Sequence, residues 1–220
     1  LNPWSVKAFN ALYYGKAGRT LVFGSELKAL RAHPDFEARM DRGAVALYFR
    51  HNYIPDPQCI YEAARKLLPG HILSVGPDGG ERMTRYWSAQ EVVLRGAENP
   101  FPGSEAEATE ELERLLMDAV GLRMLADVPL GAFLSGGIDS SLVVALMQAQ
   151  STRPVKTFCI GFAEEDANEA PHARAVANHL GTEHTELFPT PQDMLSFIPQ
   201  SAEHWDVPFG DAGQVNAYWV

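Results

Sequence analysis

The residues whose types and spacing most clearly suggest ligand chemistry form one short loop, Ser135-Gly136-Gly137-Ile138-Asp139-Ser140-Ser141. Two adjacent glycines let backbone N–H groups approach a ligand without interference from a Cβ atom. Hydroxyl donors for phosphate oxygens come from Ser135, Ser140 and Ser141. The carboxylate of Asp139 would repel a bare phosphate, so we expect it to act through Mg²⁺ bound to the phosphates. The loop therefore predicts a site for nucleotide phosphates.

The loop differs from a P-loop, because it has no Gly-Lys-Ser/Thr ending and no lysine that reaches the γ-phosphate. A cradle without that lysine suits the β,γ-pyrophosphate as a leaving group. It implies attack at the α-phosphate and formation of an adenylate. The alternative interpretation is a helix start whose glycines serve packing alone. The complete string, between an apolar strand and a helix, argues against that alternative.

The segments around the loop predict an α/β sheet. We expect a buried strand over 128–134 before the loop and a helix over 140–150 after it. Further strands are predicted over 155–162 and 183–188, separated by a helix over 171–180 that ends at a glycine. Alternating strands and helices imply right-handed crossovers and a parallel sheet. The loop would lie at the carboxyl end of a strand, where open α/β sheets bind ligands.

A second block is predicted on the N-terminal side of a linker at residues 95–104, because proline and glycine there interrupt both helices and strands. In this block we expect a strand over 20–23, a helix capped by Ser25, and a helix over 41–49. Segments 71–75 and 82–87 flank a Pro/Asp/Gly turn and predict a β-hairpin. The two predicted domains are residues 1–95 and 105–220, the second opening with an amphipathic helix over 107–125.

Composition excludes some partners. The chain has 220 residues, 18 Lys and Arg against 28 Asp and Glu, and a formal net charge of −10. Without a cluster of basic residues, nucleic acid and anionic membrane surfaces are not expected as partners. No apolar run approaches the ~20 residues of a membrane span. Cys59 and Cys159 stand far apart with no CxxC pair, which is typical of a reducing compartment and disfavours structural zinc.

The loop resembles that of the N-type ATP pyrophosphatases, and the chain from about residue 12 to 220 resembles the glutamine-hydrolysing asparagine synthetases (asparagine synthetase B family). Beyond the loop, the segments that carry the resemblance are Phe23–Leu30, Leu67–His71, Arg85–Trp87, Leu125–Gly131 and Ala175–His184.

The resemblance implies a fold and an activity. The fold would be the C-terminal part of an Ntn-type α+β glutaminase domain, followed by part of a parallel-sheet synthetase domain of the adenine nucleotide alpha hydrolase-like type. The activity would be ATP- and Mg-dependent formation of asparagine from aspartate through a β-aspartyl-AMP intermediate, with ammonia released from glutamine. A cytoplasmic location follows from the resemblance, and a homodimer is compatible with it.

The resemblance also implies roles for single residues. Leu134 and Ile160 would contact the adenosine, and Asp139 would hold Mg through the phosphates. The residues that would bind the pyrophosphate are Ser135, Gly136, Gly137, Ser140 and Ser141.

Departures from the family pattern limit these expectations. The family's glutaminase nucleophile is a cysteine at the mature N-terminus, whereas position 1 is Leu1. We therefore expect a chain truncated at both ends that has no glutaminase activity and no assignable catalytic residue. Val207 and Ala212-Gly213 stand where the family usually has Glu and Ser-Ser, which leaves the acid substrate open. Two alternatives remain: a related AMP-forming ligase of the β-lactam or peptide-modifying type, and an inactive fragment.

Overall fold

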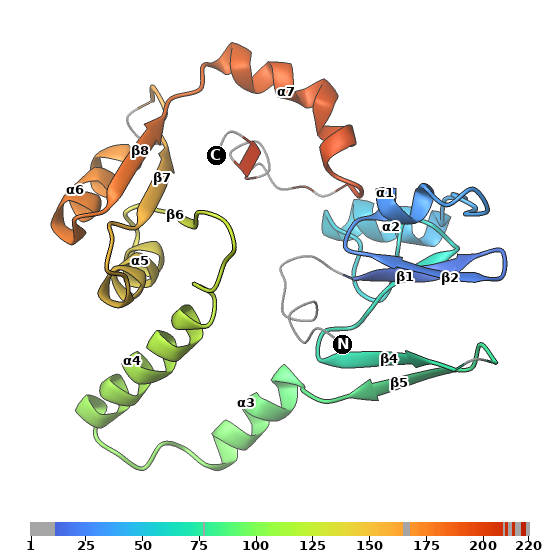
Figure 1. The fold of residues 1–220 in the computed structure, drawn as a ribbon, viewed down its shortest axis with the longest axis horizontal. Helices are drawn as coiled ribbons and strands as arrows, with labels where there is room; N and C mark the ends of the chain where they lie inside the picture. The colour runs from blue at the N-terminus through green and yellow to red at the C-terminus, as the bar shows by residue number, and fades with distance from the viewer. Residues whose placement is uncertain are drawn as a thin grey trace. The chain divides into compact units, whose positions relative to one another are not determined.

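The computed structural model describes residues 12–76, 78–164, 168–208, 210, 213 and 217–218, apart from the side chain of residue 202. The chain divides into two compact units (Figure 1). Unit 1 comprises residues 1–100 and 199–211, and unit 2 comprises residues 101–198 and 212–220. Each unit is described separately below.

Unit 1 contains an antiparallel sheet of order β2-β1-β3, formed by β1 (Tyr13–Ala17), β2 (Thr20–Gly24) and β3 (Ala64–Lys66). Helices α1 (Leu27–Arg31) and α2 (Arg42–His51) lie between β2 and β3 in the chain. The predicted strand over 20–23 and helix over 41–49 are confirmed. The core of this unit consists of Tyr13, Leu27, Leu30, Ala44, Ile54, Cys59, Ile60 and Ala64.

The ends of the short helices follow from capping. Asp41 begins α2, because its Oδ1 accepts hydrogen bonds from the backbone N–H groups of Gly43 (2.7 Å) and Ala44 (3.2 Å). The predicted cap at Ser25 is wrong. Glu26 is the N-cap of α1, in an extended conformation and without a side-chain capping bond, so the first turn starts one residue later.

The predicted hairpin is confirmed as β4 (His71–Val75) paired antiparallel with β5 (Glu81–Arg85). The predicted linker is wrong in its first part, because α3 (Ala89–Glu98) continues through residues 95–98. The hydroxyl of Ser88 caps α3 by accepting from the N–H of Glu91, and a single glycine at position 96 does not end a helix that is already nucleated.

Unit 2 contains the parallel sheet that the sequence predicted. Its order is β6-β7-β8, from β6 (Gly131–Phe133), β7 (Lys156–Ile160) and β8 (Glu183–Leu187). Helix α5 (Ile138–Gln150) connects β6 to β7, and α6 (Ala170–Leu180) connects β7 to β8. Gly181 ends α6 in the left-handed conformation at φ 71°, as predicted for that glycine.

Two further helices precede and follow the strands of this sheet in the sequence. Helix α4 (Glu105–Gly121) begins with a capping box, in which Ser104 and Glu107 each satisfy a backbone N–H of the other. The helix ends at Gly121 and not at 125, because glycine has low helix propensity. Helix α7 (Pro191–His204) follows β8 and contains Pro199.

The core of unit 2 lies between the sheet and its helices and consists of Leu134, Val144, Cys159, Ala170, Ala173 and Ala177. The three alanines share one face of α6, and their small size allows the helix to approach β7 closely. The prediction that residues 128–134 form a buried strand is wrong in two respects. The strand spans only Gly131–Phe133, and Val128 and Phe133 are mostly exposed. Pro129 has no N–H to donate to a strand neighbour, so the ladder starts after it.

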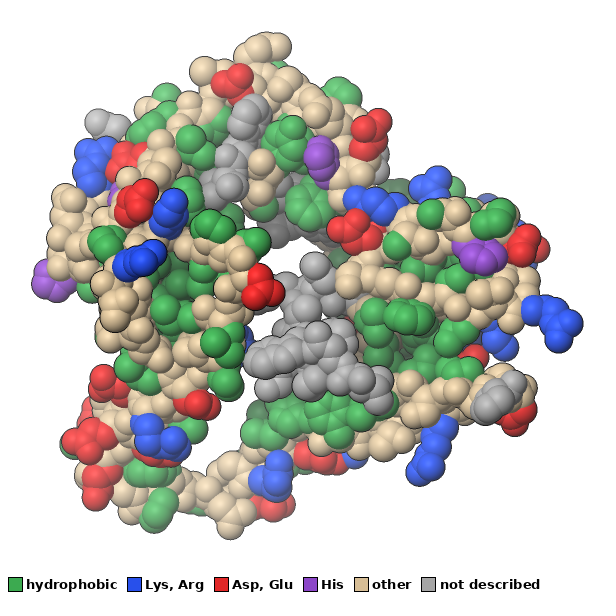
Figure 2. Space-filling view, in the orientation of Figure 1, with side chains coloured by type: hydrophobic (Ala, Val, Ile, Leu, Met, Phe, Trp, Pro, Cys, Tyr) green, Lys and Arg blue, Asp and Glu red, His purple; other side chains and the backbone are tan. Residues whose placement is uncertain are grey.

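Within the described residues, no helix is long and apolar enough to cross a membrane. The same residues contain no group of three or more His, Cys, Asp or Glu side chains placed to hold a metal ion. On the face shown in Figure 2, Lys and Arg side chains are scattered among acidic ones.

Candidate functional site

The Ser-Gly-Gly loop connects the carboxyl end of β6 to the first turn of α5 (Figure 1). The N–H of Leu134 donates to the carbonyl of Phe158 (2.8 Å), which fixes the start of the loop to β7. Gly137 is the N-cap of α5 and makes no side-chain cap. The first N–H groups of this 13-residue helix therefore point toward the loop without helical partners, as in an anion-binding helix terminus.

Gly136 is required by both its conformation and its surroundings. Its φ of +79° lies in the left-handed region that side chains disfavour. A Cβ atom built on Gly136 would lie 2.7 Å from the backbone nitrogen of Ala173 and 2.7 Å from the carbonyl carbon of His172. The loop is thus in backbone contact with the first turns of α6.

The serine hydroxyls of the loop hold it closed. The hydroxyl oxygens of Ser135 and Ser140 are 2.9 Å apart, and Ser140 Oγ also accepts from the N–H of Ser135 (3.2 Å). The N–H of Gly137 donates to Ser135 Oγ (3.2 Å). Ser141 Oγ is buried and has no hydrogen-bond partner within the described part of the chain. Ser141 borders an apolar groove of about 540 Å³ between α5 and α6.

Asp139 lies in the first turn of α5 and is exposed. A carboxylate in this position is favoured by the positive end of the helix dipole, and it can reach a cation in solvent. A left-handed glycine, a helix N-terminus and an accessible carboxylate together fit a magnesium-bound polyphosphate.

The two residues predicted to contact adenosine differ in their surroundings. The side chain of Leu134 is 1% exposed and belongs to the core of unit 2, so only its backbone could reach a nucleotide. Ile160 is half-buried at the end of β7, and the next residue, Gly161, leaves room for the ring of Phe188. Leu134 directly follows β6 and Ile160 ends the neighbouring strand β7, so both lie at the edge of the sheet where the loop begins.

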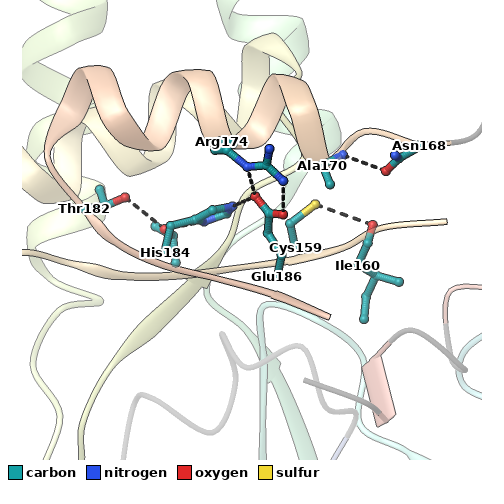
Figure 3. A network of polar contacts seen from close by, with 9 residues as sticks. Cys159, Ile160, Asn168, Ala170, Arg174, Thr182, His184 and Glu186 are labelled. Carbon is teal, nitrogen blue, oxygen red and sulfur yellow. Dashed lines mark hydrogen bonds and ion pairs between the residues drawn. The ribbon is translucent and has the colours of Figure 1, made fainter. Parts of the chain in front are cut away.

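A polar network behind this edge was not predicted from the sequence (Figure 3). Glu186 on β8 accepts two hydrogen bonds from Arg174 on α6, and Thr157 on β7 joins His184 and Thr182. The two hydrogen bonds from Arg174 lower the pKa of Glu186 and raise that of the guanidinium. Because side chains alternate along β8, His184 and Glu186 share the face toward α6. This alternation would have predicted the network only if the helix packed on that face had been known.

The fold is a mixed α/β one in which an antiparallel sheet precedes a three-stranded parallel sheet. The family model for the glutamine amidotransferase domain matches residues 9–87, and the model for asparagine synthase matches residues 111–220. The asparagine synthase match covers half of the chain and includes the loop.

The chain belongs to the asparagine synthase family. It is 30% identical over 221 residues to asparagine synthetase [glutamine-hydrolyzing] 1 of Bacillus subtilis (strain 168), covering 100% of this chain and 33% of that protein. It is 34% identical to a putative asparagine synthetase [glutamine-hydrolyzing] 2 of Methanocaldococcus jannaschii, over 94% of this chain and 40% of that protein. It is 35% identical to human asparagine synthetase [glutamine-hydrolyzing], over 87% of this chain and 37% of that protein. The chain thus spans between a third and two fifths of the length of these relatives.

Proposed function

We propose that this chain acts in an ATP-dependent amide ligase that makes asparagine from aspartate, with ammonia released from glutamine. The observation that carries the proposal is the Ser-Gly-Gly-Ile-Asp-Ser-Ser loop between β6 and α5, in a chain that belongs to the asparagine synthase family. The proposed domains are residues 1–95 for the amidotransferase region and 105–220 for the synthetase region.

In the proposed chemistry the aspartate β-carboxylate attacks the α-phosphorus of ATP; an O–P bond forms to give β-aspartyl-AMP, and the bond to the β-phosphate breaks to release pyrophosphate. Negative charge grows on the departing pyrophosphate, so fixed N–H donors at the loop stabilise the transition state more than the ground state. Ser135, Gly136, Gly137, Ser140 and Ser141 are proposed to surround the pyrophosphate. Ammonia would then displace AMP from the β-aspartyl-AMP intermediate.

Magnesium fits the same site. Asp139 is the loop's exposed carboxylate, and it is proposed to hold Mg²⁺ that neutralises phosphate charge when bound. The backbones of Leu134 and Ile160 are proposed to border the adenosine at the ends of β6 and β7, since the Leu134 side chain is committed to the core.

The test is a calorimetric titration of ATP, with and without Mg²⁺, into the chain and its Asp139→Asn variant. With Mg²⁺, Asp139→Asn should weaken ATP binding by about tenfold or more, because a charge-assisted contact is lost. Without Mg²⁺, the variant should bind ATP at least as well as the parent chain, because a repulsive carboxylate has been removed. Asp118→Asn, an exposed carboxylate on α4, is the matched control and should change neither titration.

Absence of ATP binding by the parent chain, or equal weakening by both substitutions, would overturn the assignment of the loop. The acid substrate requires a second assay, aspartate-dependent exchange of labelled pyrophosphate into ATP. Exchange supported by another carboxylic acid but not by aspartate would replace asparagine formation with a related AMP-forming ligase activity.

A further inference from the structure

The polar network between α6, β7 and β8 connects the sheet to the helix that contacts the loop. Arg174 Nε donates to Glu186 Oε1 at 2.7 Å, and Arg174 Nη2 donates to Glu186 Oε2 at 2.5 Å. This two-point geometry fixes the orientation of both side chains, unlike a single ion pair. The side chain of Glu186 is only 14% exposed, although that of Arg174 is 56% exposed, so the pair is shielded from solvent on the carboxylate side.

A second part of the network lies beside Glu186 on the sheet. His184 Nε2 lies 3.6 Å from Glu186 Oε1, and His184 Nδ1 lies 2.9 Å from Thr157 Oγ1. Thr157 is fully buried, and its hydroxyl also lies 2.9 Å from that of Thr182. The carboxylate that pairs with Arg174 therefore lies beside a buried polar cluster formed by β7 and β8 (Figure 3).

Arg174 directly follows the two residues that touch the loop. A Cβ at Gly136 would lie 2.7 Å from atoms of His172 and Ala173, so the backbone of α6 at this point forms a wall of the loop. Any shift of α6 along the sheet would change the space available to Gly136. Within the described residues, the Arg174–Glu186 ion pair links α6 to β8 of the sheet.

We propose that Arg174 and Glu186 are positioning residues for the phosphate loop: their paired hydrogen bonds hold α6 at the depth that keeps Gly136 in its left-handed conformation. This inference rests on the proposed function for its effect on ATP, but its effect on the loop does not require a nucleotide. Neither side chain is proposed to touch the substrate.

A matched pair elsewhere in unit 2 separates positioning from simple stabilisation. Arg114 and Glu111 form the same two-point contact, at 2.7 and 2.6 Å, but within the single helix α4. The experiment compares Glu186→Gln with Glu111→Gln in the 220-residue chain. Amide hydrogen exchange of the peptide 134–141 without nucleotide, thermal unfolding, and Mg-ATP affinity are measured for each variant.

Glu186→Gln should speed amide exchange in residues 134–141 and weaken Mg-ATP binding by about fivefold, the scale of coupling through a packed element. Glu111→Gln should change neither. A double substitution, Arg174→Met with Glu186→Gln, should weaken binding no further than either single substitution, because one contact is removed in each case.

Unchanged loop exchange in Glu186→Gln would overturn the inference, as would equal effects of Glu186→Gln and Glu111→Gln. If the parent chain binds no Mg-ATP, the proposed function fails for this chain while the exchange measurement still decides the positioning role. The two failures are therefore distinguishable.

Discussion

Replacement of Gly136 by alanine tests whether the loop is set by its contact with α6. The new Cβ would meet Ala173 N, His172 C and His172 Cβ, each at 2.7 Å. The first two are backbone atoms of α6, and backbone atoms in a helix cannot rotate away as a side chain can. The residue also has φ +79°, where alanine is strained by about 1–2 kcal/mol.

Gly181 is the matched control, because it has a similar φ of +71° but no atom within 4 Å of its would-be Cβ. Gly181→Ala should therefore destabilise by the conformational strain alone, about 1–2 kcal/mol. Gly136→Ala adds overpacking, which is worth about 1–3 kcal/mol, so its total should be about 2–5 kcal/mol. Urea denaturation of both variants measures the difference through the shift of the unfolding midpoint at constant slope.

If Gly136→Ala is no more destabilising than Gly181→Ala, the contact between the loop and α6 does not constrain the chain, and our reasoning is refuted. Retention of full Mg-ATP binding by Gly136→Ala would also contradict the proposed cradle. A steeper or shallower denaturant slope would indicate a change in the unfolded ensemble and would call for the exchange measurement instead.

Three further predictions concern stability. Burial, and to a smaller extent the charge of nearby Cys59, raises the pKa of Tyr13 from 10.0 to about 12. The free energy of unfolding should therefore be unaffected below pH 10 and should fall by at most about 2.7 kcal/mol as pH rises toward 12. Tyr13→Phe should remove this fall in alkaline urea titrations. Asp41→Ala should cost about 1 kcal/mol through loss of the α2 cap, whereas Asp41→Asn should cost little, as judged by thermal unfolding. Hydrogen bonds from Arg174 lower the pKa of Glu186 below 4.5, so the contribution of ionised Glu186 to the free energy of unfolding should be present above pH 4.5 and be lost as pH falls further. In Glu186→Gln, the free energy of unfolding should therefore decrease less steeply at acid pH.

The connection of β6 to α5 through the Ser-Gly-Gly loop could be predicted from the sequence because its signals are local. Its glycines, serines and the following helix lie within a few residues of one another, so the pattern can be recognised without the rest of the fold, whereas the contact of Gly136 with α6 could not be. The prediction for the strand before the loop was wrong in length and in burial. An apolar run over 128–134 suggested burial, but Pro129 interrupts the hydrogen-bond ladder and the sheet pairs only Gly131–Phe133 with β7.

The Arg174–Glu186 network could not be predicted for the opposite reason. Its hydrogen bonds join residues 12 to 27 positions apart in the sequence, and β8 has polar residues on both faces. Charged residues at alternate positions of a strand usually indicate a solvent-exposed face. Only the packing of α6 against β8 turns Glu186 into the partner of Arg174.

The two loop glycines separate packing from ligand binding. Gly136 is constrained by α6, so losing it would lower both stability and nucleotide affinity, and neither result alone would identify the cause. Gly137 has φ −71°, and its would-be Cβ meets only the Ser135 hydroxyl, at 3.3 Å. Gly137→Ala should therefore cost less than about 1 kcal/mol of stability. If its N–H and the open space beside it serve a polyphosphate, calorimetry should show a loss of Mg-ATP affinity larger than this loss of stability. Unchanged affinity in Gly137→Ala would mean that the second glycine of the loop serves the helix start alone.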